Sequence, residues 1–343
     1  MPPGPGRIVD MASRYFDSCV LFAASDLGVF GALAERGKAT VSTLATALEC
    51  DARGLRLLLD AAVAVELLVK DGDHYRNSPD AGIFLVPGAP GDLSKAIRYN
   101  RDVFAAWGRL PDLVRTGRPV EAPELHLGRD TERTRNFVLA MHGRALGIGR
   151  ALIPVLDLEG CRAVLDIGGG PGTYSALLAG KYPAASFTVL DLPDVAAIAR
   201  DLIAGQNLAD RVRVTGGDYH VTPFPAEQDA VLFLGVLHQE SAVSIEDLMR
   251  RAFQALRPGG RVVVMDLMTD ATHAAPKFSA LFAVNMALTT RDGWVFSDAE
   301  MRGWMETAGF TGITVQPLPS PMPHWLMTAR KGMDSITHAT LTV

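Results

Sequence analysis

Residues 161–194 constrain the fold of this chain more than any other stretch, because they combine two strands, a glycine-rich turn and a helix. The apolar run 163–165 suits a strand that is buried on both faces, and Asp166 follows at its carboxyl end. A turn rich in glycine comes next, then a helix over residues 174–181 and a second strand that closes at Asp191. This alternation predicts a parallel sheet that binds a ligand at the carboxyl ends of its strands.

The spacing of the glycines decides which ligand the turn suits. A dinucleotide fingerprint that starts at Gly168 and Gly170 needs a third glycine where this chain has Thr173. The glycines instead follow the pattern D-x-G-x-G-x-G, which starts at Asp166. Asp191 lies about twenty residues further on, where a carboxylate can accept hydrogen bonds from both hydroxyls of a ribose. A glycine-rich turn that holds no ligand is the alternative.

Composition narrows the class of protein. At 343 residues the chain predicts about two domains, and its hydrophobic content of 48% is that of a globular protein. The net charge of -5 argues against nucleic acid or an anionic membrane as the main partner. Cys19, Cys50 and Cys161 show neither metal spacing nor a disulfide framework, so we expect no metal and a cytoplasmic setting. We expect no signal peptide, because MPPGPGRIVD lacks its charged and apolar regions, and no membrane span, because no run approaches roughly 20 apolar residues.

The N-terminal part predicts helices and then a winged helix. Residues 8–35 carry apolar side chains near a 3.6-residue period, which suits packing against another subunit or within the same chain. Thr40 and Asp51 are placed to cap two further helices, and a hairpin ends near Tyr75. Residues 38–80 contain five basic and seven acidic side chains, whereas a DNA-recognition surface should be basic. We therefore favour packing or dimerisation over DNA binding.

The rest of the chain alternates helices and strands after two helical segments. Helices are expected over residues 93–114 and 131–152, and the polar stretch between them reads as an interdomain connection. The alternation after Asp191 predicts a mostly parallel, doubly wound α/β sheet. We expect three parts along the chain: a mostly helical, winged-helix-like domain over 1–115, the doubly wound domain over 116–330 and a loose tail over 331–343.

These motifs together resemble the class I S-adenosylmethionine (SAM)-dependent O-methyltransferases of the caffeate, hydroxyindole and antibiotic-tailoring group. The specific part of the resemblance is the ordered set DIGGGPG, LDLPDV, GGDYH, LHQE and RPGGRVVVMD. It implies a Rossmann-like domain that binds SAM, preceded by a dimerisation domain that forms a homodimer. The acceptor would be a small molecule.

The resemblance also assigns site residues. It places the cofactor against Asp166, Gly168, Gly170, Asp191, Leu192, Gly217, Asp218 and Tyr219. Asp191 would hold the ribose, Asp218 would accept from the adenine amino group, and Tyr219 would lie beside the ring. His238 matches the general base, and Asp266 stands where an acidic residue often orients it. Acceptor-binding candidates are Met141, His142, Phe282, Asn285 and Met286.

The chain departs from the family pattern around the base. Many plant members have Lys-x-x-x-His-Asp-Trp, but here Leu234 takes the lysine position and Gln239-Glu240 replace Asp-Trp. These changes leave the SAM-binding motifs intact, but the residues around the predicted base differ from the plant arrangement.

Three function classes compete. The leading one is transfer of a methyl group to a hydroxyl of a small, aromatic metabolite, which needs a base to remove the proton. A variant transfers it to sulfur or carbon, and a thioether acceptor needs no such base. A SAM-binding or winged-helix regulator without catalysis is the second class. A nicotinamide-dependent oxidoreductase is the third, and Thr173 disfavours it.

Overall fold

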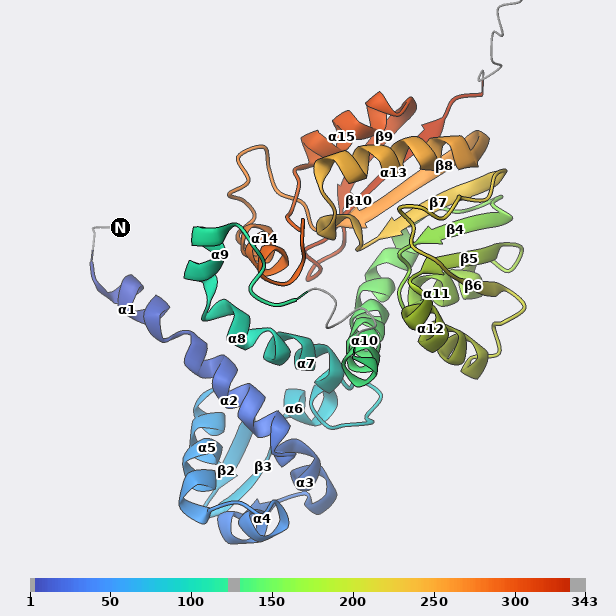
Figure 1. The fold of residues 1–343 in the computed structure, drawn as a ribbon. Coiled ribbons are helices and arrows are strands. Elements are labelled where there is room, and N and C mark those ends of the chain that lie inside the picture. The colour runs from blue at the N-terminus through green and yellow to red at the C-terminus, as the bar shows by residue number, and fades with distance from the viewer. Residues whose placement is uncertain (1–3, 123–129, 334–343) are drawn as a thin grey trace, which may run out of the picture. The chain divides into compact units, whose positions relative to one another are not determined.

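The computed structural model describes residues 4–122 and 130–333, and the chain forms two compact units, Met1–Asp102 and Val103–Val343 (Figure 1). The domain boundary expected between residues 115 and 116 falls inside the second unit and stays a prediction. Part of the expected interdomain connection, residues 123–129, lies outside the described residues. So does most of the expected loose tail, whose first residue, Lys331, ends a strand.

The first unit starts with helices. In chain order its elements are α1 (Gly6–Ser13), α2 (Tyr15–Asp26), α3 (Val29–Arg36), β1 (Ala39–Thr40), α4 (Val41–Ala47), α5 (Ala52–Ala64), β2 (Leu68–Asp71), β3 (His74–Asn77), α6 (Pro79–Phe84) and α7 (Ser94–Asp102). Both predicted caps are confirmed. The hydroxyl of Thr40 accepts from the amide of Thr43, and the carboxylate of Asp51 accepts from the amide of Gly54 at 2.7 Å.

Strands β1, β3 and β2 form a small antiparallel sheet, in which β2 and β3 are the expected hairpin. Large apolar side chains of this unit are fully buried, among them Phe30, Leu44, Leu59 and Tyr75. Three helices followed by a hairpin give the order of a winged helix. No single helix among the described residues is long and apolar enough to cross a membrane, although one bent pair, Gly6–Asp26 with Val29–Arg36, passes a test of length and composition.

The expected helix over residues 93–114 is wrong as a single element. The chain there forms α7, the short α8 (Phe104–Trp107) and α9 (Leu110–Thr116). Gly108 ends α8, and Pro111 stands in the first turn of α9, where its ring and missing N–H are tolerated. The prediction of helical structure is thus confirmed, whereas the breaks within it were not predicted.

The second unit contains the large sheet. Its further elements are α10 (Thr131–Val155), β4 (Ala163–Ile167), α11 (Thr173–Lys181), β5 (Ser186–Asp191), α12 (Pro193–Gly205), β6 (Val212–Gly216), β7 (Gln228–Leu234), α13 (Ala242–Ala255), β8 (Leu256–Asp266), α14 (Lys277–Thr289), α15 (Asp298–Thr307), β9 (Phe310–Pro317) and β10 (Trp325–Lys331). Seven strands pair in the order β6-β5-β4-β7-β8-β10-β9. All pairs from β6 to β8 are parallel, whereas β10 runs antiparallel to both of its neighbours.

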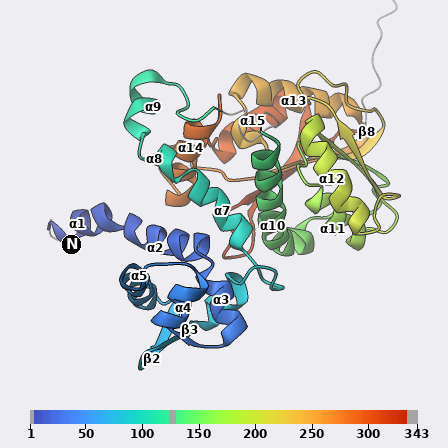
Figure 2. The same cartoon turned by 60° about the horizontal axis from the view of Figure 1, so that its bottom comes forward.

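Helices cover both faces of this sheet. One core joins the sheet to α10, α11 and α12 through buried residues such as Leu152, Leu178 and Ile203. The other joins it to α13 and α15 through Ile245, Met249 and similar side chains, and Figures 1 and 2 show these helices on the opposite face. The predicted doubly wound architecture is confirmed.

This topology brings the predicted site residues to one edge. Strands β4, β5, β6, β7 and β8 are parallel neighbours, so their carboxyl ends lie together. The glycine turn follows β4, Asp191 ends β5, and Asp218 comes shortly after β6. His238 lies in a 3₁₀ turn, Leu237–Gln239, shortly after β7, and Asp266 ends β8.

Candidate active site

The glycine turn after β4 has a backbone that favours glycine and leaves space for a ligand. Gly168 and Gly170 have φ angles of +62° and +54°, in the left-handed region. A Cβ atom at Gly168 would lie 2.4 Å from Cγ2 of Val236, so protein atoms exclude a side chain there. A Cβ atom at Gly170 would meet nothing within 4 Å. The turn is therefore open at Gly170, where a ligand can approach the backbone.

Asp166 lies beneath this turn and is fully buried. Its Oδ2 accepts a hydrogen bond of 2.7 Å from the hydroxyl of Ser175 in α11, while its Oδ1 is buried with no partner among the described residues. Burial raises the pKa of Asp166 to about 7. This carboxyl group is thus bonded to α11 and lies away from the open side of the turn.

Asp191 faces the glycine turn from the end of β5. Its Oδ2 accepts from the amide of Gly170 and its Oδ1 accepts from the amide of Leu192, both at 2.7 Å. Burial raises the pKa of Asp191 to about 6, against the opposing effect of these two amides. The structure thus joins two predicted cofactor residues, and Leu192 begins the following helix as its N-cap.

Gly217 and Asp218 follow β6 and have different surroundings. A Cβ atom at Gly217 would lie 2.5 Å from Oγ1 of Thr222, so neighbouring protein atoms account for this glycine. Oδ1 of Asp218 accepts from the amide of His220 at 2.9 Å and lies 2.7 Å from its Nδ1. No hydrogen bond from a described residue engages Oδ2. The bonds from His220 outweigh burial and lower the pKa of Asp218, which keeps it ionised as an acceptor.

Tyr219 is buried between the glycine turn and a second acid. A Cβ atom at Gly168 would lie 3.4 Å from its ring, and its hydroxyl donates to Oε1 of Glu240 at 2.5 Å. Burial, together with the charge of Glu240, raises the pKa of Tyr219 well above its ordinary value. Its ring therefore stays neutral, beside the predicted position of the nucleoside.

The predicted base and its partner are in contact. Nδ1 of His238 lies 2.7 Å from Oδ1 of Asp266, and Oδ2 of Asp266 accepts from the amide of His238 at 3.2 Å. Oδ1 also accepts from the amide of Leu267 at 2.8 Å. Asp266 is fully buried, whereas the His238 side chain is 18% exposed. The carboxylate thus holds one ring nitrogen and leaves Nε2 for a reacting group.

The acceptor candidates on α14 differ in how they lie. The ring of Phe282 packs edge-on against His238, with centroids 5.2 Å apart. Oδ1 of Asn285 instead accepts from the indole N–H of Trp107 at 2.9 Å. Met286 is buried, and its Cβ lies close to Gly293. The structure thus brings Phe282 to the base and gives Asn285 a partner on α8 that the sequence did not indicate.

The candidates on α10 are partly buried. Nδ1 of His142 lies 2.7 Å from the hydroxyl of Thr173, the first residue of α11. His142 therefore lies beside the start of the helix that follows the cofactor turn. Met141 is half-buried.

His324 was missed by the sequence analysis. It immediately precedes Trp325, whose backbone pairs with Asp266 across β10 and β8, so it reaches the same edge of the sheet. Its Nδ1 is buried with no partner among the described residues, and burial lowers its pKa to about 4. The imidazole is therefore neutral. The antiparallel pairing of β10 brings it to this edge, which the pattern of apolar residues does not reveal.

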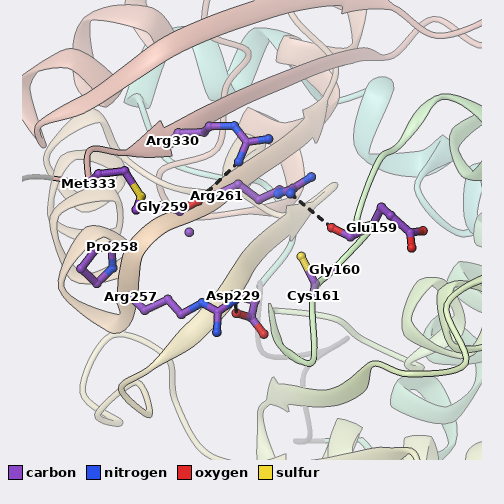
Figure 3. A pocket seen from close by; sticks show the side chains of 11 residues that line it. Glu159, Gly160, Cys161, Asp229, Arg257, Pro258, Gly259, Arg261, Arg330 and Met333 are labelled. Carbon is purple, nitrogen blue, oxygen red and sulfur yellow. Dashed lines mark hydrogen bonds and ion pairs between the residues drawn. The ribbon is translucent and has the colours of Figure 1, made fainter.

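The opposite edge of the sheet also has a pocket. Its volume is about 370 Å³, and its lining includes Cys161, Arg257, Arg261, Arg330 and Met333 (Figure 3). Arg257 pairs there with Asp229, and Arg261 pairs with Asp157 at 3.2 Å. The pocket lies at the amino ends of β4, β7 and β8, away from the site. Among residues 4–122 and 130–333, no group of three or more His, Cys, Asp or Glu side chains is arranged to hold a metal.

The residues at the carboxyl edge fit SAM. An open glycine turn, an acid aligned by two amides and an ionised acid after the next strand suit an adenosyl group. The fold and the site thus define a SAM-dependent methyltransferase. The chain belongs to the O-methyltransferases: the family model of the O-methyltransferase domain matches residues 109–311, and that of the O-methyltransferase dimerisation domain matches residues 9–87.

Two curated relatives and one solved structure are similar over nearly the whole chain. The tetracenomycin polyketide synthesis 8-O-methyl transferase TcmO of Streptomyces glaucescens is 32% identical, covering 93% of this chain and 95% of the relative. The N,N-dimethyltransferase OxyT of Streptomyces rimosus is also 32% identical, covering 94% and 96%. The crystal structure of human N-acetylserotonin methyltransferase in complex with SAM matches with a TM-score of 0.86 and 28% identity, covering 96% of this chain and 98% of that chain. The predicted family, fold and cofactor are confirmed.

Proposed function

We propose that this protein transfers a methyl group from SAM to a hydroxyl of a small aromatic metabolite, with His238 as the general base. The observation that carries the proposal is the pair formed by His238 and Asp266 at the same sheet edge as the glycine turn. TcmO is named an 8-O-methyl transferase of tetracenomycin polyketide synthesis and the human relative an N-acetylserotonin methyltransferase, and both names support a small-molecule acceptor.

Methyl transfer to a hydroxyl requires the protein to align the acceptor, exclude water and remove a proton. Bound SAM supplies a methyl group on a positively charged sulfur, and the protein must align an acceptor with it and exclude water. Asp266 accepts a hydrogen bond from the Nδ1–H of His238, so that Nε2 is the atom that takes the proton from the acceptor hydroxyl. The imidazolium that results lies against the buried carboxylate, which stabilises its charge.

The proposed cofactor contacts follow the carboxyl edge. Gly168 and Gly170 approach the methionine end, and Asp191 and Leu192 hold the ribose. Asp218 accepts from the adenine amino group through Oδ2, and Asp166 and Gly217 keep the two turns in shape. Tyr219 lies beside the adenine.

The proposed acceptor site includes Met141, His142, Phe282, Asn285 and Met286. The contact between Phe282 and His238 supports an aromatic acceptor, because a flat ring packed on Phe282 would bring its hydroxyl close to the base. The hydrogen bond from the indole of Trp107 fixes the side chain of Asn285 on α14. Substitution of Phe282 by alanine should raise the KM for the acceptor more than the KM for SAM.

The test is release of S-adenosylhomocysteine from SAM against phenols, quinones, hydroxy acids, thioethers and aromatic amines. We expect turnover on a phenol that the His238→Ala variant loses. Turnover on a thioether that the variant keeps would instead assign S-methylation and reduce His238 to a pocket residue. Bound SAM with no turnover on any acceptor would support the regulator without catalysis.

Nitrogen is a second candidate acceptor atom. The similarity to OxyT, which is named an N,N-dimethyltransferase, favours including it. An amine acceptor also sheds a proton, so loss of His238 would slow that reaction too. The identity of the methylated product, determined by mass spectrometry and NMR, separates the two cases.

We also propose a homodimer formed through the first unit, in a cytoplasmic setting. The dimerisation-domain match supports the dimer, and the apolar side chains of Ile8, Val9, Met11, Tyr15 and Phe16 are all more than half exposed on α1 and α2. An exposed apolar surface of this kind suits a second copy of the chain. The three cysteines are free in the structure, which suits a reducing compartment.

A further inference from the structure

Glu240 is a buried acid with an unusual number of partners. Its side chain is 8% exposed, and it stands two residues after His238, where many plant members have tryptophan. Besides the bond from Tyr219, its Oε2 accepts from the hydroxyl of Ser244 at 2.5 Å and lies 2.8 Å from Nε2 of His220. Burying a carboxylate costs free energy unless hydrogen bonds and an opposite charge compensate it. The network around Glu240 supplies that compensation.

His220 connects this acid to the proposed adenine site. Its Nε2 meets Glu240, and its Nδ1 meets Oδ1 of Asp218 at 2.7 Å. An imidazole can donate from both nitrogens only when it is protonated. The resulting chain of acid, imidazolium and acid runs from the segment after β7 to the turn after β6.

Other charged and polar groups hold the same turn. Arg251 of α13 donates to the main-chain carbonyls of Tyr219 at 2.6 Å and His220 at 3.0 Å. Its guanidinium lies 3.8 Å from Asp247, and Gln239 donates to the Tyr219 hydroxyl at 3.1 Å. The charged groups around His220 are therefore Asp218, Glu240, Arg251 and, further out, Asp247.

The segment that carries Glu240 also carries the base. The indole N–H of Trp294 donates to the carbonyl of Glu240, and its amide donates to the carbonyl of His238, both at 2.9 Å. Residues 238–240 therefore carry both the proposed base, His238, and Glu240, which contacts the turn of Asp218 through His220.

We propose that Glu240 and His220 are positioning residues for cofactor recognition: they hold Asp218 so that its Oδ2 meets the exocyclic amino group of adenine. The inference rests on the proposed adenine contact of Asp218. Neither residue touches the cofactor itself. Both act by fixing the direction of the Asp218 carboxylate, which otherwise sits on an exposed turn.

The experiment compares binding of two nucleosides by calorimetry. S-inosylhomocysteine has a carbonyl oxygen in place of the amino group of S-adenosylhomocysteine and a proton on N1, so position 6 of its base accepts hydrogen bonds and can no longer donate to Asp218. We expect wild-type protein to prefer S-adenosylhomocysteine by about tenfold or more, because a mismatched pair leaves polar groups unsatisfied. The Glu240→Gln variant should bring this preference close to one, mainly by weakening S-adenosylhomocysteine, and should raise the KM for SAM more than it lowers kcat.

Two further variants make the result decisive. Glu246→Gln changes an exposed acid on α13 and should keep the wild-type preference. His220→Gln should act like Glu240→Gln, and because His220 is half-exposed on a turn, it guards against misfolding of the first variant. An equal loss of affinity for both nucleosides in Glu240→Gln and His220→Gln would show a purely structural role and overturn the inference.

The outcome also separates this inference from the proposed function. If wild-type protein binds the two nucleosides equally, Asp218 does not read the amino group and the inference falls. Methyl transfer to an acceptor, measured independently by product formation, would remain unaffected by that result.

Discussion

Nδ1 of His238 lies 2.7 Å from Oδ1 of the fully buried Asp266, and two backbone amides fix the orientation of that carboxylate. The two residues are 28 positions apart, and the pairing of β7 with β8 brings them together. A carboxylate in this position selects the ring tautomer whose free nitrogen, Nε2, faces away from it. The ring and its partner are thus arranged before any acceptor binds.

The first prediction concerns this pair. His238→Ala should lower kcat on a hydroxyl acceptor by roughly 10²–10⁴-fold, the usual contribution of a general base. Asp266→Asn should also lower kcat, because an amide favours the wrong tautomer. Stopped-time assays of methylated product measure both, and calorimetry should show unchanged SAM affinity for His238→Ala. A His238→Ala variant with wild-type kcat on a phenol would contradict the assignment of His238 as the base.

The second prediction separates two glycines of the turn. Gly170→Ala should fold, with about 1–2 kcal/mol of stability lost to its positive φ, and should bind SAM about tenfold more weakly because its added methyl enters open space on the ligand side. Gly168→Ala should lose about 2–4 kcal/mol of stability, because its methyl would collide with Val236 and its φ is positive. Urea unfolding and SAM titration measure the two effects. Wild-type affinity in Gly170→Ala would place the cofactor elsewhere.

The third prediction concerns the acid beneath the turn. Burial raises the pKa of Asp166 to about 7, above its value in the unfolded chain, so the folded protein retains a proton that the unfolded chain releases. Stability without SAM should therefore fall as pH rises from about 4 to about 7. Asp166→Asn carries no charge and should be more stable than wild type at about pH 8, by roughly 2–4 kcal/mol, but not at pH 4.

Urea unfolding of both proteins across this pH range provides the check. Parallel stability curves for wild type and Asp166→Asn would mean that Asp166 is ionised in the folded state.

The fourth prediction tests the proposed dimer. Replacing both Ile8 and Phe16 by glutamate should shift the protein toward the monomer by about tenfold or more, because two charges would enter the apolar contact. Light scattering after size exclusion measures the mass. Val243→Glu is the matched control, since Val243 is 79% exposed on α13 and should not affect assembly. A double variant that keeps the wild-type mass would refute a contact through this face.

The fifth prediction follows from His220. Burial works to lower the pKa of His220, but the hydrogen bonds and charges of Glu240 and Asp218 outweigh it, so the pKa is raised. The imidazolium form of His220, which is hydrogen-bonded at both ring nitrogens, is therefore present at low pH. It is lost as the pH rises through the raised pKa of His220. SAM affinity should therefore decline as the pH rises from about 6.5, the ordinary pKa of histidine, through the raised pKa of His220.

Calorimetry of SAM binding across that range gives the measurement. In Glu240→Gln the decline should move to lower pH, because His220 loses one of the two charges that hold its proton. A pH profile that is identical in the two proteins would contradict the role of Glu240.

The sequence predicted the elements around the turn closely, because strand, glycines, helix and acid are local signals. Gly168, Gly170 and Asp191 were predicted from their spacing and from the family resemblance, and the structure joins the amide of Gly170 to Asp191. The helix caps at Thr40 and Asp51 were read in the same way. The single helix expected over 93–114 was wrong because the breaks at Gly108 and Pro111 were not taken into account.

By itself, then, the sequence determined the order of helices and strands, the family and the set of groups at one sheet edge. Only the tertiary structure decided which side chains meet, including some that the sequence did not indicate: Glu240 with His220 and Tyr219, Asn285 with Trp107, and His324 with the edge of Asp266. The physical reason is that periodicity and turn chemistry act over a few residues. A hydrogen bond between distant side chains depends on strand pairing and on which neighbours burial leaves within about 3 Å.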